Sequence, residues 1–510
     1  MNAGRMLIRA DAGPTIGMGH WMRSIALAEG WRRAGGTARF ATTNAPADFD
    51  RQITERGFAI DRLSEAGDLA RDSQALLTTC ETWRPHWVIV DGYQFSHDYL
   101  AAIKTAGWRL ALIDDLSRAA HALADVVVNQ NLGAAPVENP AARTAQLCGT
   151  RFALLRREFR NRAVRWPGAD DCQQILVTMG GADPPNFSAA VLSALESFDE
   201  ALQVVVVAGP ANPHRELLAQ QASGSRHAVR VITSPDNLPE LMRASRLAIS
   251  AAGSTCWELA AIGTPMIVVS LAENQDANGC QLAMHGAAIQ LGRCDAVQAQ
   301  EIASAVRGLL SDPARLNAMS EKGRQLVDGR GADRVVADLL TRTVHLRRAR
   351  FEDARLVHQW SNEPEVRAVS FRQDAIDWSE HVGWFHRQLA ADTPLFWIAS
   401  DGHGVPVGQI RFHWQEGAAV VSLTVARARR GHGIARQMLM QATHEVFRAT
   451  GCGRIVAWVK PDNHPSLRLF NAMRYRNCGC LSNAGEPAFR FELDRESEGA
   501  ATSTTVAAGA

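Results

Sequence analysis

A histidine follows the last glycine of a glycine-rich turn near the start of the chain. The stretch Met6–Ala28 reads MLIRADAGPTIGMGHWMRSIALA, and His20 stands where the pattern changes to that of a helix. A glycine-rich turn between a strand and a helix brings backbone N–H groups and the positive end of a helix dipole up to an anion, usually phosphate. The same dipole favours a neutral imidazole. His20 is therefore a candidate general base beside a diphosphate; the alternative is a local hydrogen bond at a helix start.

Polar residues also gather where other apolar runs end. Asp11, Asp91 and Tyr93 follow predicted strands in the first third of the chain. Because ligands bind at the carboxyl ends of the strands in an open α/β sheet, these residues are candidates for substrate contacts. Asp114 and Asn131 occupy similar positions, and for each of them a helix cap or a turn is the simpler explanation.

Two further glycine-rich turns open predicted helices in the middle of the chain. They lie at Gly180–Gly181, in MGGADP, and at Gly253–Thr255, in SAAGST. Glu258 follows one helical turn after the second, where a carboxylate can accept hydrogen bonds from both hydroxyls of a ribose. The alternative is a glutamate on the solvated face of its helix.

Short apolar runs predict the elements that position these residues. Up to residue 165, we predict strands at Met6–Ala10, Ala38–Ala41, Trp87–Val90, Leu110–Ile113 and Val126–Asn129. None alternates polar and apolar residues, which is typical of strands covered on both faces in a parallel sheet. After a linker rich in Pro, Gly and Asp (Arg165–Cys172), we predict strands at Ile175–Met179, Val204–Ala208, Val229–Ile232, Leu247–Ser250 and Met266–Ser270. Two such domains facing a cleft suit a nucleotide-linked substrate.

The last third of the chain has a different pattern. It predicts a strand from Val344, a helix at Trp378–Leu389 and antiparallel strands at Pro394–Ala399, Pro406–Trp414 and Ala418–Ala426. The hexapeptide RGHGIA, Arg430–Ala435, then fits R-x-x-G-x-A before a long helix, and a strand at Ile455–Val459 follows. Consecutive N–H groups at such a helix start can hold a pyrophosphate.

Composition narrows the class of protein. The 510 residues predict two to four domains, and 54 basic against 53 acidic side chains give a net charge of +1, which argues against nucleic acid or an anionic membrane as the main partner. The nine cysteines form no disulfide or metal framework. Neither a signal peptide nor an apolar run of about 20 residues is present, so we expect a soluble cytoplasmic protein. Residues 496–510 predict a disordered tail.

The first two thirds of the chain resemble a known family. GPTIGMGHWMR, the DGY after a strand, LRREF, MGGADP, and SAAGSTCWELAAIGTPMIVV followed by ENQ are similar to the UDP-sugar hydrolase of pseudaminic acid biosynthesis over about residues 5–340. That family is similar in fold to the MurG-type glycosyltransferases (GT-B). The resemblance implies hydrolysis of UDP-2,4-diacetamido-2,4,6-trideoxy-β-L-altropyranose to UDP and the free sugar, with His20 as the catalytic residue. It implies no metal, and the sequence suggests none.

Residues of these motifs make up the candidate substrate-binding set. The members are Asp11, Gly17, Gly19, Arg23, Asp91, Tyr93, Gly180, Gly181, Asp183, Ser250, Gly253, Ser254, Thr255, Glu258, Asn274 and Gln275. The resemblance makes Tyr93 an active-site tyrosine and gives the serine, glycine and glutamate of SAAGST…E to the uridine diphosphate.

The last third resembles the GNAT acetyltransferases, and WSNEPEVR and EHVGWF are similar to the 4-amino-sugar N-acetyltransferase of the same pathway. The resemblance implies that acetyl-CoA is bound, and the candidate residues are Leu423, Val425, Arg430, Gly431, His432, Gly433, Ile434, Ala435 and Asn463. Phe470 replaces the tyrosine that usually protonates the leaving thiolate. We nevertheless expect activity, with Tyr475 or a water as the candidate proton donor.

The sequence thus predicts an α/β protein with two Rossmann-like domains facing a cleft (GT-B-like), followed by a GNAT α+β domain. The predicted boundaries are 1–165, 170–342, 344–495 and a tail at 496–510. We expect hydrolysis of the UDP-sugar and acetyl-CoA-dependent 4-N-acetylation of the preceding UDP-4-amino-sugar, with UDP-aminosugar, acetyl-CoA and water as partners. The alternatives are a GT-B glycosyltransferase fused to an acyl-CoA-binding GNAT domain, and a non-catalytic sugar-nucleotide sensor. The sequence does not fix the sugar's stereochemistry, the oligomeric state or channelling.

Overall fold

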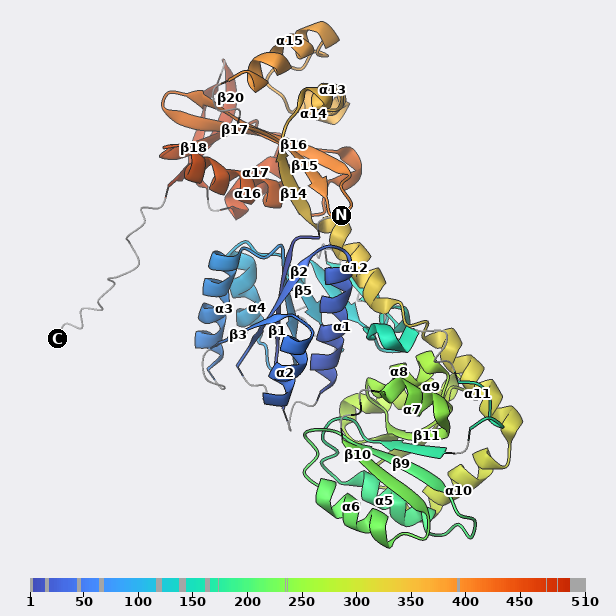
Figure 1. Cartoon of the computed structure of the whole chain (residues 1–510). Coiled ribbons are helices and arrows are strands. Elements are labelled where there is room, and N and C mark those ends of the chain that lie inside the picture. Colours follow the sequence, from blue (N-terminus) through green and yellow to red (C-terminus); the bar gives the residue numbers. More distant parts are fainter. Residues whose placement is uncertain are drawn as a thin grey trace, which may run out of the picture. The chain divides into compact units, whose positions relative to one another are not determined.

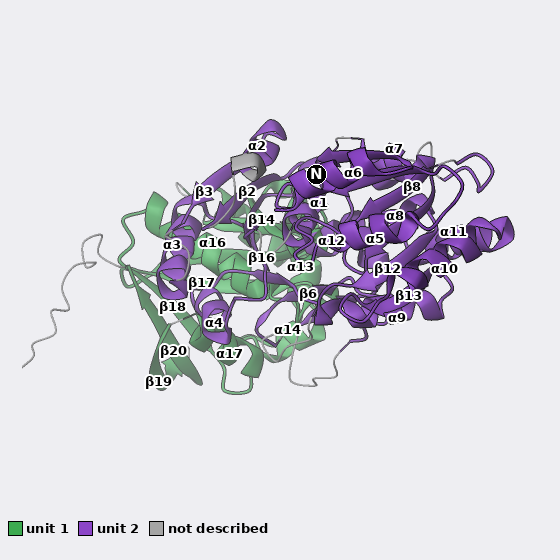
Figure 2. Cartoon of the chain, turned by 90° about the horizontal axis from the view of Figure 1, so that it is seen from below, with its two compact units in different colours: residues 1–2, 340–510 green, residues 3–339 purple. Residues whose placement is uncertain are grey.

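A computed structural model describes most of the chain (Figure 1). The described residues are 3–13, 18–43, 47–63, 68–115, 122–136, 144–160, 166–172, 174–233, 235, 237–391, 395–473, 475–483 and 485–495. Gly17, Arg165 and the predicted tail therefore lie outside them. The chain folds into two compact units (Figure 2). The first unit is residues 3–339, and the second is residues 340–510 together with residues 1–2. Each unit is described by itself.

The first unit begins with a seven-stranded parallel sheet. Its order is β3-β2-β1-β4-β5-β6-β7, and every pair of neighbours is parallel. The strands are β1 Arg5–Ala10, β2 Thr37–Thr42, β3 Ala59–Arg62, β4 Trp87–Asp91, β5 Leu110–Ile113, β6 Val126–Asn129 and β7 Ala145–Cys148, and the helices between them are α1 Gly19–Arg33, α2 Ala47–Glu55, α3 Leu69–Trp83 and α4 His97–Thr105. The five predicted strands are confirmed, whereas β3 and β7 were not predicted.

A second parallel sheet of six strands follows in the same unit, in the order β10-β9-β8-β11-β12-β13. Its strands are β8 Gln174–Thr178, β9 Gln203–Ala208, β10 Ala228–Thr233, β11 Ser245–Ala251, β12 Met266–Ser270 and β13 Ala288–Arg293, and its helices are α5 Phe187–Leu195, α6 Arg215–Gly224, α7 Leu238–Ala244, α8 Thr255–Ile262, α9 Asp276–Met284, α10 Ala299–Leu310 and α11 Pro313–Leu326. The strands β4, β5, β6 and β12 are buried along their whole length. Helices on both faces explain why these runs are uniformly apolar (Figure 1).

Helix α12, Gly331–Arg342, returns to the first sheet. Gly30 of α1 leaves room for it, since a methyl group at Gly30 would lie 3.1 Å from Cγ2 of Val336. Arg33 of α1 also pairs with Asp333 at 3.0 Å. The chain therefore crosses twice between the two sheets, once after the first sheet and once before α12. The crossings meet where a methyl group at Gly329 would lie 2.9 Å from Cβ of Arg160.

The second unit has one mixed sheet of seven strands, in the order β14-β15-β16-β17-β18-β20-β19. Only the pair β17–β18 is parallel, and its ladder covers two positions, Ala419 with Ile455 and Val420 with Val456. The strands are β14 Val344–Arg348, β15 Phe396–Asp401, β16 Pro406–Gln415, β17 Ala418–Val425, β18 Arg454–Val459, β19 Arg476–Asn483 and β20 Glu486–Asp494, with helices α13 Ala354–Ser361, α14 Pro364–Ala368, α15 Trp378–Leu389, α16 Ile434–Ala449 and α17 His464–Ala472.

The fold class is as predicted, and α15 has its predicted bounds. The strands β19 and β20 were not predicted. Within the described part of the chain, no helix combines the length and the apolar character needed to cross a membrane.

Candidate active sites

The glycine-rich turn delivers His20 to the carboxyl ends of β1 and β4. His20 is the second residue of α1 and is 6% exposed. Its Nδ1 lies 2.6 Å from Oδ1 of Asp91, the last residue of β4. Among the described residues, Nε2 has no partner. Nδ1 also lies 2.9 Å from Nη2 of Arg23, which can only donate, whereas the carboxylate of Asp91 can only accept. The shorter contact, to Asp91, favours the tautomer with the proton on Nδ1, in which Nε2 keeps a lone pair.

Arg23 forms an ion pair with Asp91, the carboxylate that contacts His20. It lies one turn after His20 and donates to both oxygens of Asp91, at 2.8 and 2.6 Å. Burial alone would raise the pKa of Asp91, but Arg23 and His20 hold it down to about 2. Asp91 is fully buried, and its pairing with Arg23 and His20 keeps it ionised.

A second carboxylate extends this network. Asp115 accepts from Arg23 at 2.7 Å and from the hydroxyl of Tyr93 at 3.0 Å. Burial and the charge of Asp115 raise the pKa of Tyr93, which therefore stays protonated. The Tyr93 ring packs edge-on against His20, with centroids 4.7 Å apart. The other oxygen of Asp115 is buried without a partner among the described residues.

A cavity of about 590 Å³ opens beside His20, and residues that follow strands of both sheets line it. Eleven described members of the predicted set line it together with His20: Gly19, Arg23, Tyr93, Gly180, Gly181, Asp183, Gly253, Ser254, Thr255, Asn274 and Gln275. The two walls come very close, since a methyl group at Gly19 would lie 3.1 Å from Oγ of Ser254. The sheets' glycine-rich turns thus meet at one cavity.

Asp183 lines the cavity but also caps a helix. Its two carboxylate oxygens accept from the backbone N–H groups of Phe187 and Ser188 at 2.8 and 3.0 Å. Both residues belong to the first turn of α5. Both carboxylate oxygens therefore already have backbone donors.

Four other members of the predicted set are not among the lining residues. Asp91 lies behind His20, as described. Asp11 belongs to a buried network with Arg9, at 2.7 Å, and accepts from Gln94 at 3.0 Å. Ser250 is fully buried and donates to the carbonyl of Ala251.

Glu258 is the fourth of these residues. Its nearest cation is Arg156, at 3.6 Å, and its side chain is 14% exposed. Burial raises the pKa of Glu258 to about 7, against the opposing effect of Arg156. The carboxyl group is thus poised between its two protonation states near neutral pH.

Sequence reasoning missed several lining residues. Asp115, Gln94, Gln130 and Asn278 line the cavity but were not in the predicted set. Oδ1 of Asn278 is buried and has no partner among the described residues. Asp115 carried a signal, because it ends the run LIDD at the carboxyl end of β5. Asn278 carried none, since it lies inside α9.

In the second unit, the R-x-x-G-x-A turn lies at the start of α16, as predicted. Gly431 and Gly433 adopt φ values of 84° and 72°, which side chains rarely adopt. Arg430 donates to the carbonyl of Val425 at 3.0 Å and forms an ion pair with Glu363. The ladder between β17 and β18 ends at Val420. From there to the end of β17 at Val425, which precedes this turn, the two strands are not paired with each other.

A cavity of about 610 Å³ in this unit is lined by Leu423, Asn463 and Phe470, among others. The turn Arg430–Ala435 does not line it. Asn463 caps α17 by accepting from the N–H of Ser466 at 3.2 Å.

Tyr475 is not in a position to replace the missing tyrosine. It belongs to the hydrophobic core, and its hydroxyl lies 3.2 Å from that of Thr443. Burial raises its pKa, and it does not line the cavity. Phe470 lines the cavity and packs between the rings of Tyr475 and Phe491.

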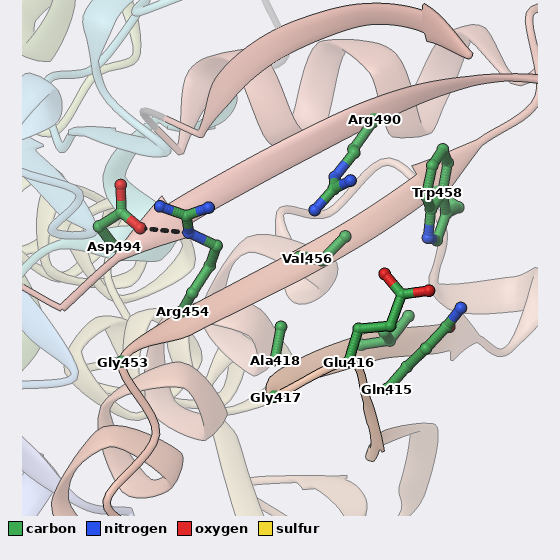
Figure 3. A pocket seen from close by; sticks show the side chains of 11 residues that line it. Gln415, Glu416, Gly417, Ala418, Gly453, Arg454, Val456, Trp458, Arg490 and Asp494 are labelled. Atoms are coloured by element: carbon green, nitrogen blue, oxygen red, sulfur yellow. Dashed lines mark hydrogen bonds and ion pairs between the residues drawn. The ribbon is translucent and has the colours of Figure 1, made fainter.

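A smaller hollow of about 410 Å³ shares Gln415, Val420 and Trp458 with this cavity. Figure 3 shows Arg454 paired with Asp494 at one end of it and Trp458 at the other. It extends the larger cavity along the outer face of the sheet.

Comparisons with known proteins agree with this division. Residues 174–334 match the glycosyltransferase family 28 C-terminal domain, and residues 343–476 match the acetyltransferase (GNAT) domain. The spore coat polysaccharide biosynthesis protein SpsG of Bacillus subtilis is 26% identical over 337 residues, which cover 65% of this chain and 96% of SpsG. An uncharacterized protein of Methanocaldococcus jannaschii, MJ1062, is 25% identical over 277 residues, which cover 52% of this chain and only 55% of that protein.

Among solved structures, MurG of Acinetobacter baumannii superposes with a TM-score of 0.50 at 16% identity, over 66% of this chain and 99% of MurG. At this identity the likeness shows the fold alone. The chain thus joins a part of GT-B fold, which contains the match to the glycosyltransferase family 28 C-terminal domain, to a part that matches the acetyltransferase (GNAT) domain.

Proposed function

We propose that the first unit hydrolyses a UDP-linked diacetamido-trideoxy sugar to UDP and the free sugar, with His20 as the general base. The sugar expected from the sequence is UDP-2,4-diacetamido-2,4,6-trideoxy-β-L-altropyranose. The observation that supports this proposal is the 2.6 Å contact between Nδ1 of His20 and Asp91. This contact favours the tautomer with the proton on Nδ1, which leaves Nε2 as the basic nitrogen.

In the proposed reaction, Nε2 of His20 removes a proton from a water that attacks the anomeric carbon. The new C–O bond forms as the bond between that carbon and the UDP oxygen breaks, and UDP leaves with the electron pair. The imidazolium that forms is stabilised by Asp91, which stays ionised because its pKa is about 2.

The leaving diphosphate needs donors that are already in place. The turns that contain Gly19, Gly181 and Ser254 line the cavity and precede helices, so their N–H groups and helix dipoles stabilise developing negative charge. Glu258 then takes the ribose, one helical turn beyond Ser254.

We propose that the second unit acetylates the 4-amino group of the UDP-sugar that precedes the hydrolase substrate. The turn Arg430–Ala435 would hold the pyrophosphate of acetyl-CoA, as its glycine conformations support. The neutral amine attacks the thioester carbonyl, the C–N bond forms, and the C–S bond breaks to release the CoA thiolate. The nitrogen loses one proton in forming the amide, and water or the leaving thiolate takes it up. Two consecutive steps would then be joined in one chain.

The match to the glycosyltransferase family 28 C-terminal domain favours a second candidate. In a glycosyltransferase, His20 would take its proton from an acceptor hydroxyl instead of water. The uridine diphosphate site and the base would be the same.

One experiment separates the two candidates. The full chain is incubated with the acetylated UDP-sugar alone, and UDP release is followed by a coupled assay. A hydrolase releases UDP at catalytic rates without any acceptor, whereas a transferase stays nearly silent. Loss of the release in His20→Ala attributes it to this site, and release that persists there contradicts the proposed base.

A further inference from the structure

The 610 Å³ cavity of the second unit is unusually rich in arginine. On β16 alone, alternate residues Gln409, Arg411, His413 and Gln415 line it. Four arginines (Arg367, Arg372, Arg387 and Arg411) and one carboxylate (Glu380) are the charged side chains among its lining residues. Glu380 is already paired with Arg372 at 2.6 Å. The cavity therefore carries excess positive charge.

Arg411, on β16, lines this cavity and stacks on a tryptophan. Among the described residues, no hydrogen bond or ion pair is made to its guanidinium, which lies 4.6 Å over the ring centroid of Trp384. Burial, and secondarily the charge of Arg367, lowers the pKa of Arg411 to about 10. Arg411 is half-buried. A partly desolvated cation without an anion among the described residues is costly, which favours an anionic ligand at this site.

Arg367 has the same deficit. It donates to the carbonyl oxygens of Ser361 and Arg372, at 2.6 and 3.0 Å, and to the hydroxyl of Ser370. None of its partners among the described residues is a carboxylate. Those hydrogen bonds hold its position, and its positive charge remains uncompensated beside that of Arg411.

Gln409 adds an acceptor to the same cavity. Its Nε2 donates to the hydroxyl of Thr424 at 3.2 Å, which orients the amide. The oxygen Oε1 is buried in a residue that is 1% exposed, and it has no partner among the described residues. A buried acceptor of this kind calls for a donor from a ligand.

We propose that this cavity recognises the diphosphate of the acetyl acceptor through Arg411 and Arg367, while Gln409 accepts a hydrogen bond from the acceptor's sugar. This inference rests on the proposed function, in which the acceptor is a nucleotide-linked amino sugar. Arg411 can donate two parallel hydrogen bonds to phosphate oxygens. Arg367, whose three guanidinium nitrogens already donate to protein oxygens, adds a second positive charge beside them. The hollow that continues past Trp458 gives room for the nucleoside (Figure 3).

The diphosphate bound in this cavity could belong to the acceptor or to CoA, and the two cases change different kinetic constants: the KM for the acceptor or the KM for acetyl-CoA. CoA also carries a pyrophosphate, which the turn Arg430–Ala435 would hold outside this cavity. Initial rates of CoA release are measured for the wild type and Arg411→Gln, with a UDP-linked 4-amino-4,6-dideoxy sugar as acceptor. We expect the KM for the acceptor to rise roughly 10- to 100-fold and that for acetyl-CoA to stay unchanged. Arg411→Lys keeps the positive charge but loses the planar guanidinium that donates two parallel hydrogen bonds. Its acceptor KM should lie between those of the wild type and Arg411→Gln.

Arg348→Gln is the matched control. Arg348 also stacks on a tryptophan, with its guanidinium 4.2 Å from the Trp397 centroid, but lies outside the cavity. Its substitution should leave the acceptor KM unchanged. An unaltered acceptor KM in Arg411→Gln overturns the proposal, and a raised acetyl-CoA KM instead assigns the anion to CoA.

A binding experiment keeps the inference separate from the activity. UDP is titrated calorimetrically into the full chain saturated with CoA. We expect two sites in the wild type and one in Arg411→Gln, whereas uridine, which lacks the diphosphate, should not distinguish the two proteins. If the wild type binds two UDP molecules but acetylates nothing, the proposed reaction fails and the anion site stands. One site in both proteins contradicts the anion site.

Discussion

Gly19 and Ser254 lie on opposite walls of the cleft and are almost in van der Waals contact. A methyl group at Gly19 would be 3.1 Å from Oγ of Ser254, closer than ordinary packing allows. Gly19 is not among the glycines with a positive φ, so alanine can adopt its backbone conformation without strain. Any cost of Gly19→Ala therefore reports on the distance between the walls.

Gly19→Ala should lower kcat/KM for UDP release about tenfold, because the two phosphate-binding turns must separate. In the Ser254→Ala background, where Oγ is gone and the nearest atom of residue 254 lies 4.0 Å away, the same change should cost much less. Steady-state kinetics of the double-mutant cycle measure the difference. Equal costs in both backgrounds would contradict this contact.

His20→Ala should reduce UDP release by about 10²–10⁴, the usual worth of a positioned general base. Asp91→Asn should also be impaired, because the amide can donate to Nδ1 and favour the wrong tautomer. Acetyl transfer by the second unit should not change in either variant, and its rate serves as the folding control. Unchanged UDP release in His20→Ala would remove this residue from the mechanism.

Glu258→Ala tests the ribose contact. Loss of a charge-assisted hydrogen bond costs about 1.5–3 kcal/mol, so the Kd for UDP should rise roughly 10- to 150-fold. Calorimetry of the first site, measured in the Arg411→Gln background, avoids a contribution from the second. If the Kd is unaltered, Glu258 has only its ion pair with Arg156.

Glu258→Gln should make stability less dependent on pH. The pKa of Glu258 is raised to about 7 in the fold, against an ordinary value near 4.3. Its contribution to stability is therefore complete below about pH 4.3 and is lost as the pH rises through 7. At pH 8 the variant should be more stable than the wild type by up to roughly 3–4 kcal/mol. Thermal unfolding at pH 5 and 8 measures the gap, with the exposed Glu321→Gln as control.

Phe470→Tyr should raise the rate of acetyl transfer less than about tenfold, since a free thiol with a pKa near 8.5 is only slightly too basic to leave unaided at pH 7. Tyr475→Phe should leave the pH–rate profile unchanged, because its hydroxyl contacts Thr443 in the core. It should cost only about 1 kcal/mol of stability for a buried hydrogen bond. If Tyr475→Phe removed the fall in rate at alkaline pH, Tyr475 would be the proton donor to the leaving thiolate after all.

Much of the fold could be predicted because its central strands are apolar throughout. VIV of β4 and LALI of β5 are uninterrupted apolar runs between turn residues, which predict buried strands. AIDR of β3 has only two apolar residues, and Gln146 interrupts the apolar residues of AQLC in β7. These two are the edges of the first sheet, where one side of the strand is not paired within it.

The site was predictable in outline and not in its pairings. His20 and the glycine-rich turns carry local signals, but the contact of His20 with Asp91 depends on how β1 and β4 lie side by side. Arg411 had no signal, because one arginine in the strand PVGQIRFHWQ reads as a solvated side chain. Only the fold shows that Arg411 is half-buried over the ring of Trp384, with no anion beside it in the part of the chain that the structure describes.

The two crossings of the chain in the first unit meet at Arg160 and Gly329, where Gly329 has a φ of 73°. Because the two connecting segments lie side by side here, we expect the two lobes to rotate about this point rather than slide past each other. We expect UDP to close the cleft by such a rotation, which moves the phosphate-binding turns most and the hinge residues least. Double electron–electron resonance between spin labels placed on the two lobes, with and without UDP, measures this swing, and an unchanged distance distribution would contradict it.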